Sequence, residues 1–127
     1  RTALKQPAPL PDITKLEWLR QAKRDLVSEA DPNQQYDIDN TRRLGKGGFG
    51  EVYYAKHRET GEEVAIKMLE INQKNRMEYL LIETDLHARV SDHKNVVKFV
   101  DAFLLREKKE FWVVLEYIDG CTLYDLA

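Results

Sequence analysis

The sequence predicts an α+β domain, an antiparallel sheet into which one helix is inserted. Strand-forming segments and one helical segment follow in the order strand, strand, strand, helix, strand, strand, and short turns join most of them. The length of 127 residues is enough for one domain with a core of its own. Lysine and arginine number 20 against 22 aspartate and glutamate, a formal net charge of −2, so no basic excess points to nucleic-acid binding.

The N-terminal part predicts a linker followed by a helix. Residues 1–13 contain three of the four prolines and are expected to be extended. Thr14 and Glu17 have the spacing of a capping box, and apolar residues then recur at helical spacing. We therefore expect an amphipathic helix over about 14–30, which Asp31 and the proline after it would end.

Five segments enriched in β-branched and aromatic residues predict the strands. Residues 75–90 contain neither glycine nor proline and have a wide apolar stripe, which predicts a helix lying on the sheet. The predicted strands are residues 36–44, 51–57, 64–69, 96–105 and 111–117. The expected organisation is an extended proline-rich linker (1–13), a helix and turn (14–35), the sheet with its inserted helix (36–119) and the start of a further helix (120–127).

The single cysteine, Cys121, has no partner for an internal disulfide, which favours a reducing, cytoplasmic setting. No apolar run reaches the roughly 18–20 residues that a membrane-spanning helix needs, and no signal peptide is evident. A chain that opens on Arg1 is expected to be part of a longer protein. His57, His87 and His93 do not have the spacing of zinc ligands, so no metal site is expected.

A glycine cluster, Gly45-Lys46-Gly47-Gly48-Phe49-Gly50-Glu51-Val52, has the pattern G-x-G-x-x-G-x-V. Taken alone, the pattern fits a plain glycine-rich hairpin as well as a phosphate-binding loop. A dinucleotide-binding fingerprint would lead into a helix, whereas residues 51–57 have strand character. A Walker loop needs Gly-Lys followed by Ser or Thr, which this cluster lacks. The remaining arrangement is a strand–loop–strand flap whose backbone N–H groups approach nucleotide phosphates.

A lysine lies in the apolar strand Val64-Ala65-Ile66-Lys67. Strand alternation often turns such a lysine to solvent, and for this motif alone that alternative stays open. A buried ammonium group needs a counter-charge. Glu83 in the predicted helix is the candidate partner, because we expect it to share the core-facing side with Tyr79 and Ile82.

Together these motifs resemble the N-terminal lobe of the eukaryotic protein-kinase domain, over about residues 36–127. Three stretches resemble more finely the PAK branch of the sterile-20-like serine/threonine kinases: 26–36, 81–84 and 112–117. The resemblance implies a five-stranded antiparallel sheet with one inserted helix, the family's αC helix, preceded by the N-terminal amphipathic helix.

The resemblance also implies a role for each motif residue. Lys67 would hold the α- and β-phosphates of ATP, and Glu83 would be the αC glutamate that pairs with it. Leu115 would be the gatekeeper, and the backbone of Glu116 and Ile118 would hydrogen-bond the adenine edge. The other implied nucleotide-binding residues form the adenine walls and the phosphate loop: Leu44, Val52 and Ala65, and Gly45, Lys46, Gly47, Gly48, Phe49 and Gly50.

Three further positions are notable within the resemblance. His87 and Phe99 fall where the family has two members of its internal hydrophobic spine, and histidine is unusual there. Cys121 stands where the PAK group usually has a second glycine. The resemblance places this cysteine at the solvent edge of the nucleotide site, where it would react with alkylating reagents. A small, half-buried residue without such reactivity is the alternative.

The complete enzyme implied by the resemblance transfers phosphate from ATP, with Mg²⁺, to serine or threonine of a protein substrate. The strings H-R-D-x-x-x-x-N and D-F-G do not occur in these 127 residues, so the residues alone are expected to be inactive. An apolar underside left exposed would favour self-association. Any segment for small-GTPase regulation would precede Arg1. The alternative is a non-catalytic, lobe-only or pseudokinase-derived interaction module.

Overall fold

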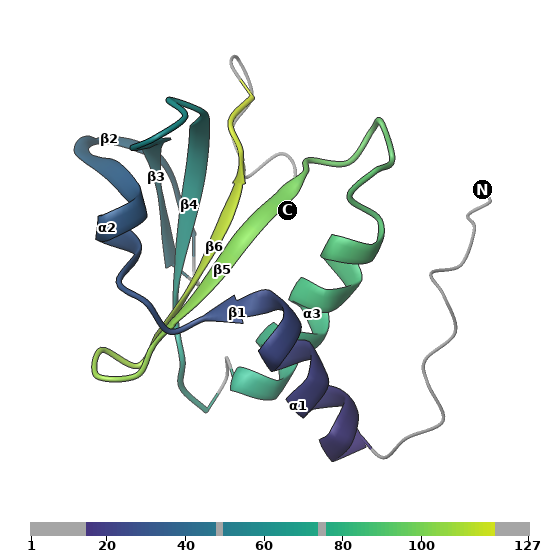
Figure 1. The fold of residues 1–127 in the computed structure, drawn as a ribbon. Coiled ribbons are helices and arrows are strands. Elements are labelled where there is room, and N and C mark those ends of the chain that lie inside the picture. Colours follow the sequence, from purple (N-terminus) through teal and green to yellow (C-terminus); the bar gives the residue numbers. More distant parts are fainter. Residues whose placement is uncertain (1–14, 48–49, 74–75, 119–127) are drawn as a thin grey trace.

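The computed structural model describes residues 15–47, 50–73 and 76–118 and confirms the α+β fold class (Figure 1). The expected linker (1–13), the Thr14 cap, residue 119 and the expected helix start with Cys121 (120–127) lie outside these residues. None of the described helices is long and apolar enough to cross a membrane. The elements are α1 (Lys15–Leu26), β1 (Val27–Ser28), α2 (Pro32–Gln35), β2 (Tyr36–Gly47), β3 (Gly50–His57), β4 (Glu63–Glu70), α3 (Met77–Arg89), β5 (Phe99–Leu105) and β6 (Glu110–Glu116).

The sheet has six strands in the order β1-β5-β6-β4-β3-β2, so the expectation of five was wrong by one. The additional strand is β1, which pairs in parallel with β5 through Val27 opposite Ala102 and Ser28 opposite Phe103. Helix α1, expected to continue to residue 30, ends at Leu26. The physical reason is the free edge of β5, whose backbone groups bond the two residues that follow the helix.

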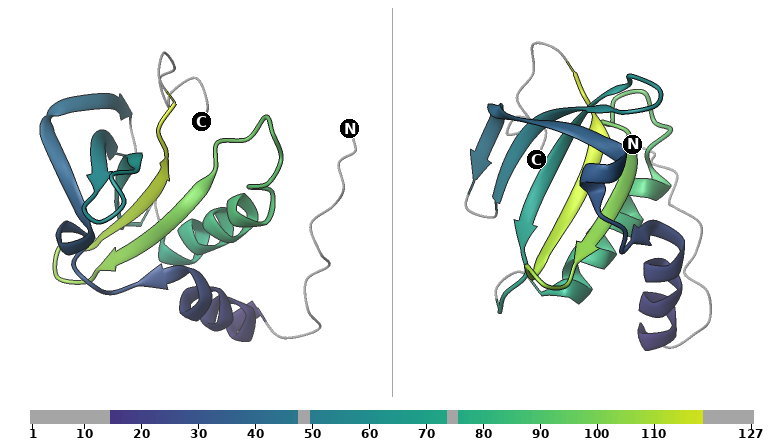
Figure 2. Two further views of the ribbon diagram at one scale, coloured as in Figure 1. Left: turned by 45° about the horizontal axis from the view of Figure 1, so that its top comes forward. Right: turned by 60° about the vertical axis from the view of Figure 1, so that its left-hand side comes forward.

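A short capped helix turns the chain from β1 into β2. The carboxylate of Asp31 accepts a hydrogen bond from the Asn33 N–H, and buried Pro32 occupies the first turn, where its missing N–H costs nothing. The chain then enters β2 at Tyr36, whose ring packs edge-on against that of Phe103 at 6.2 Å between centroids. Because β2 and β5 are not neighbours in the strand order, this contact shows that the sheet is strongly curled (Figure 2).

Both faces of the sheet are buried. Successive side chains of β6 belong alternately to two different cores. Val113 and Leu115 belong to the core on the α3 side, whereas Trp112 and Val114 belong to the core inside the curl. The second core includes Tyr36, and burial raises the pKa of its hydroxyl to about 12. Helix α3 therefore covers one face, and the curled sheet covers its own second face.

Helix α3 is rotated relative to the sequence-based expectation. Its buried side chains are Leu80, Leu81, Thr84 and Asp85, whereas Tyr79 is 50% exposed, Leu86 is 44% exposed and Glu83 is exposed. The prediction that Glu83 lies on the core-facing side is therefore wrong in this structure. Asp85 tolerates burial because Arg89, one turn later, donates a hydrogen bond of 2.8 Å to its carboxylate.

Candidate nucleotide site

The glycine cluster forms a hairpin between two antiparallel strands. Gly45 lies opposite Val52, Lys46 opposite Glu51, and Gly47 opposite Gly50. The cluster thus leads from a strand into a strand and not into a helix, as the residue pattern predicted. The predicted loop residues Gly48 and Phe49 lie outside the described part of the chain.

Gly50 has a packing role that does not depend on any ligand. A Cβ atom built on Gly50 would lie 1.8 Å from the backbone oxygen of Met68 on β4, far inside van der Waals contact. The neighbouring backbone cannot yield as a flexible side chain would. Glycine is therefore required here by the close approach of β3 and β4.

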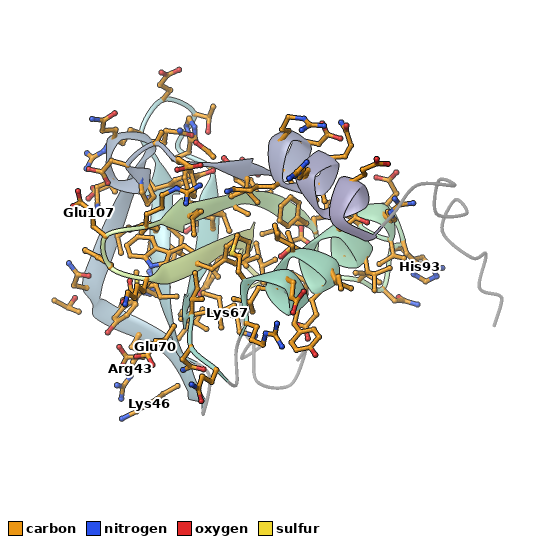
Figure 3. The ribbon with its side chains drawn as sticks, turned by 90° about the horizontal axis from the view of Figure 1, so that it is seen from below. Arg43, Lys46, Lys67, Glu70, His93 and Glu107 are labelled. Carbon is orange, nitrogen blue, oxygen red and sulfur yellow. The ribbon has the colours of Figure 1, made fainter. Side chains whose placement is uncertain are left out.

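Four of the predicted site residues share one face of the sheet. Lys67 on β4 lies opposite Val52 on β3 and Val113 on β6, and Ala65, two residues earlier, lies opposite Leu115. Directly opposed residues and residues two apart share a face. The half-buried Lys67 lies between Lys46 of the glycine hairpin and helix α3 (Figure 3). The sheet thus brings the lysine beside the proposed adenine-wall residues.

Lys67 and Glu83 are not brought together. Among residues 15–47, 50–73 and 76–118, no ion pair joins their side chains, and Glu83 faces solvent on α3. The reason is the rotation of α3, whose buried acidic residue is Asp85. Pairing of Glu83 with Lys67 requires α3 to move or turn.

The end of β6 has backbone features suited to an adenine edge. The N–H of Glu116 donates to the Lys98 carbonyl at 3.0 Å, but the Lys98 N–H donates to the Glu116 carboxylate at 2.9 Å. A regular antiparallel pair would return that second bond to the Glu116 backbone carbonyl. The side chain therefore takes the place of this carbonyl in the ladder. Ile118, two residues later, is half-buried against the α3-side core.

The proposed adenine walls are more buried than the sequence suggested. Val52 is 6% exposed, Ala65 1% and Leu115 7%, and Leu44 is half-buried. Leu115 packs in the core on the α3 side of the sheet, which explains why its side chain is not exposed to solvent. The expectation of an exposed apolar underside is thus not met at Val52, Ala65 and Leu115.

The predicted spine residues do lie near each other. The rings of His87 and Phe99 have centroids 6.2 Å apart, and Nε2 of His87 is hydrogen-bonded to the Val97 carbonyl. The histidine therefore makes one apolar and one polar contact in this position. Within the described ranges, no three side chains of His, Cys, Asp or Glu are grouped to hold a metal ion.

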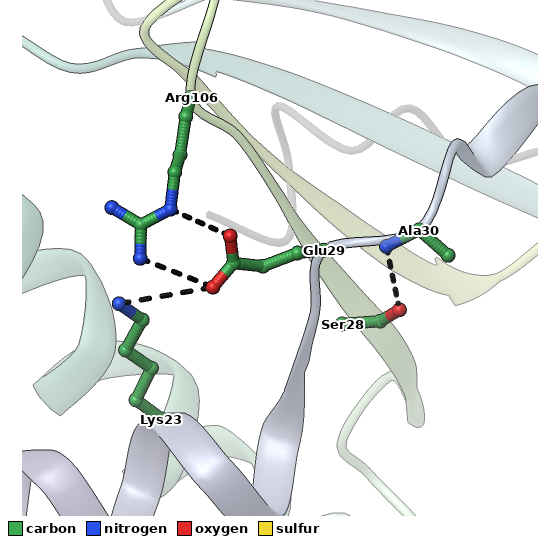
Figure 4. Close-up of polar contacts among 5 residues, drawn as sticks. All are labelled: Lys23, Ser28, Glu29, Ala30 and Arg106. Carbon is green, nitrogen blue, oxygen red and sulfur yellow. Dashed lines mark hydrogen bonds and ion pairs between the residues drawn. The ribbon is translucent and has the colours of Figure 1, made fainter.

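Two side-chain clusters at the edges of the sheet escaped sequence reasoning. On the β1 edge, the Arg106 guanidinium donates to both carboxylate oxygens of Glu29, at 2.6 and 3.1 Å (Figure 4). The Lys23 ammonium of α1 lies 4.0 Å from the same carboxylate. The hydrogen bond from Arg106 lowers the pKa of Glu29.

On the β2 side, Arg42 lies over the ring of Tyr54, with its central guanidinium carbon 3.9 Å from the ring centroid. It also donates to the Tyr117 hydroxyl at 3.1 Å. In the sequence, Tyr54 was visible only as an aromatic residue of a predicted strand. Nothing in the pattern pairs Arg42 with Tyr117, which lies 75 residues further along the chain.

A curled, mainly antiparallel sheet with a glycine hairpin, a strand lysine beside it and one inserted helix defines the class of protein-kinase N-terminal lobes. Comparison with known families agrees: residues 38–127 match the protein kinase domain. This match covers most of the chain, and the chain belongs to the protein kinase domain family, of which it contains the N-lobe region.

Curated relatives also match along most of this chain. It is 34% identical to serine/threonine-protein kinase pakC of Dictyostelium discoideum over 80% of this chain and 20% of that protein. It is 36% identical to mouse serine/threonine-protein kinase PAK 1 over 82% of this chain and 18% of that protein. For Drosophila serine/threonine-protein kinase PAK mbt the identity is 34%, over 87% of this chain and 17% of that protein. The predicted resemblance to the PAK branch is confirmed, and the chain spans a fifth or less of these relatives' lengths.

Proposed function

We propose that this chain is the ATP-binding lobe of a PAK-like serine/threonine protein kinase. The observation that carries the proposal is the shared face of Val52, Ala65, Lys67 and Leu115 beside a glycine hairpin. An apolar wall next to a lysine matches the chemistry of a nucleotide, which has a flat aromatic base and anionic phosphates.

In this proposal each residue has a distinct task. Leu44, Val52 and Ala65 contact the adenine ring, the Glu116 carbonyl and the Ile118 N–H bond its edge, and Leu115 limits the depth of the site. The face shared by Val52, Ala65 and Leu115 and the freed Glu116 carbonyl support these roles.

The phosphate end of the site belongs to the hairpin and Lys67. Backbone N–H groups of the glycine hairpin, from Gly45 to Gly50, approach the phosphates, and the Lys67 ammonium orients them. Glu83 pairs with Lys67 once α3 moves, which fixes the ammonium in place. ATP supplies the transferred phosphoryl group, and the Mg²⁺ that accompanies it in this family is held by residues outside this sequence.

The test is phosphoryl transfer by the full-length gene product carrying Lys67→Met. Radiolabelled ATP and a generic serine/threonine substrate should show activity lowered about a hundredfold or more, because a charge that stabilises the transferring phosphate is lost. Lys56→Met is the matched control: Lys56 is an exposed lysine on neighbouring β3, and its replacement should leave activity within about twofold.

The outcomes separate the candidate functions. Activity of Lys67→Met equal to wild type would refute the assigned role. Absence of transfer by the wild-type full-length protein would favour the non-catalytic interaction module. Residues 1–127 alone should transfer no phosphate, because they contain neither a catalytic-loop aspartate motif nor a D-F-G motif. Protein substrates and any regulation by a small GTPase belong to the complete enzyme.

A further inference from the structure

The register between β2 and β3 is broken beside the proposed adenine wall. Ile38 lies opposite Ala55 and the next pair is Arg43 opposite Tyr53, so four residues of β2 face the single residue Tyr54. A second irregularity follows between Arg43 and Gly45. Bulges of this kind redirect side chains and interrupt the ladder, so backbone pairing alone does not hold this part of β2 in place.

Arg42 lies at the end of the first bulge and bridges three segments. Its guanidinium stacks on Tyr54 of β3 and donates to the Tyr117 hydroxyl just after β6. The Tyr54 and Tyr117 rings meet edge to face, with centroids 5.1 Å apart. The Tyr54 hydroxyl in turn donates to the Glu63 carboxylate of β4, and the Tyr117 N–H donates to the Glu63 carbonyl at 3.4 Å.

The neighbours of these three side chains connect the cluster to the proposed nucleotide site. Leu44 follows Arg42 by two residues and directly precedes Gly45, the first residue of the glycine hairpin. Tyr54 is opposite Ala65 on the sheet and only 6% exposed. Tyr117 lies between Glu116 and Ile118. Each residue of the cluster therefore adjoins a different part of the proposed adenine-binding surface.

We propose that Arg42 is a positioning residue for nucleotide binding: by stacking on Tyr54 and bonding Tyr117, it fixes Leu44 and the base of the glycine hairpin relative to residues 116–118 at the end of β6. A planar guanidinium suits this role because it stacks on one ring while donating in its own plane to another group. This inference rests on the proposed function, since it assumes that the hairpin covers ATP. Loss of the bridge frees the hairpin and weakens ATP binding in the ground state and the transition state alike.

The test compares Arg42→Ala, Arg42→Lys and Arg106→Ala in the full-length gene product. Arg106 is the matched control because it is an exposed arginine that also bonds a side chain, but at the opposite edge of the sheet. Arg42→Ala should raise the Kd and KM for ATP about two- to fivefold, the range that a partly exposed cation–π contact allows. The kcat of Arg42→Ala should stay within about twofold of wild type, because the lost contact stabilises bound ATP and the transition state equally.

Arg42→Lys should restore part of the affinity, and Arg106→Ala should leave the KM for ATP unchanged. Hydrogen exchange without nucleotide supplies a second readout: Arg42→Ala should speed exchange at Lys46 and Val52, while α3 amides keep their wild-type rates. A general loss of folded enzyme would instead lower the apparent kcat without changing KM.

Each result decides the question. Unchanged ATP affinity in Arg42→Ala, with a wild type that binds ATP, overturns the positioning role, as does an equal increase in KM for Arg106→Ala. If the wild type binds no ATP, the proposed function fails and hydrogen exchange alone tests the bridge. Unchanged exchange at Lys46 and Val52 then shows that Arg42 holds nothing in place.

Discussion

The two edges of the sheet are each held by an arginine, but through different interactions. At the β1 edge, Arg106 forms an exposed ion pair with Glu29, and the two-residue strand β1 adds a short parallel ladder. At the β2 side, Arg42 lies on an aromatic ring across a bulge. An exposed ion pair depends on salt and pH, whereas stacking on a buried ring does not depend on a carboxylate. The edge that carries the glycine hairpin is therefore held by the contact less sensitive to solution conditions.

The residue that connects both edges is Phe103, and its loss should have the largest effect. Phe103 is fully buried, lies opposite Ser28 of β1 and packs against Tyr36 of β2. Phe103→Ala should lower the free energy of unfolding by about 3–5 kcal/mol, because it removes a large ring and leaves a cavity. Urea unfolding of the full-length protein measures this loss. Leu105→Ala, at the rim of the same core, should cost less than half as much, and equal losses would contradict the connecting role.

A smaller loss is expected at Gly50, where β3 and β4 approach each other closely. Gly50→Ala should destabilise the fold by about 1–3 kcal/mol, because the new Cβ overlaps the Met68 oxygen and forces the strands apart. Gly61→Ala is the control: nothing lies within 4 Å of its Cβ, so only its φ of 74° opposes the change, at roughly 1 kcal/mol. Both are measured by unfolding without nucleotide. If the two variants are equally stable, the close approach at Gly50 is not a packing requirement.

The sequence predicted the regular parts of the fold and missed what depends on distant neighbours. The content of β-branched and aromatic residues located all five longer strands. A two-residue strand such as Val27–Ser28 has no such pattern and exists because β5 has a free edge. In α3 the apolar stripe was too wide to fix the buried side, and packing selected the side with Leu80 and Leu81. Burial of Asp85 depends on its pairing with Arg89, which hydropathy alone does not reveal.

In the candidate site, too, some features could be predicted from the sequence and others could not. The family resemblance assigned Lys67, Val52, Ala65 and Leu115 to one site, and the strand register of the structure places them on one face of the sheet. The relation between Lys67 and Glu83 depends on how α3 is turned, and that is set by the whole core. Arg42 was not found because its stacking arises from a register shift, and a register shift leaves no periodic signal in the sequence.

The smallest effect, at the β1 edge, distinguishes the two kinds of contact directly. The hydrogen bond from Arg106 lowers the pKa of Glu29 in the folded state relative to the unfolded chain. The pair therefore stabilises the fold above the unfolded pKa, and this contribution disappears as the pH falls through the folded pKa. Arg106→Ala should lower the melting temperature slightly at neutral pH and low salt, with the difference from wild type vanishing in acid or at high salt.

Arg42→Ala should behave differently in the same melting experiments. Its closest contacts are a tyrosine ring and a tyrosine hydroxyl, neither of which changes charge between neutral pH and acid. Its attraction to the Asp39 carboxylate is the smallest of the effects that lower the pKa of that group, after two hydrogen bonds from Thr41. The difference in melting temperature between Arg42→Ala and wild type should therefore persist under the acidic and high-salt conditions that abolish the Arg106→Ala difference. If both differences in melting temperature vanish together in acid or at high salt, the two edges are held by the same kind of electrostatic attraction. The attachment of the glycine hairpin would then be as sensitive to salt and pH as the ion pair at the β1 edge.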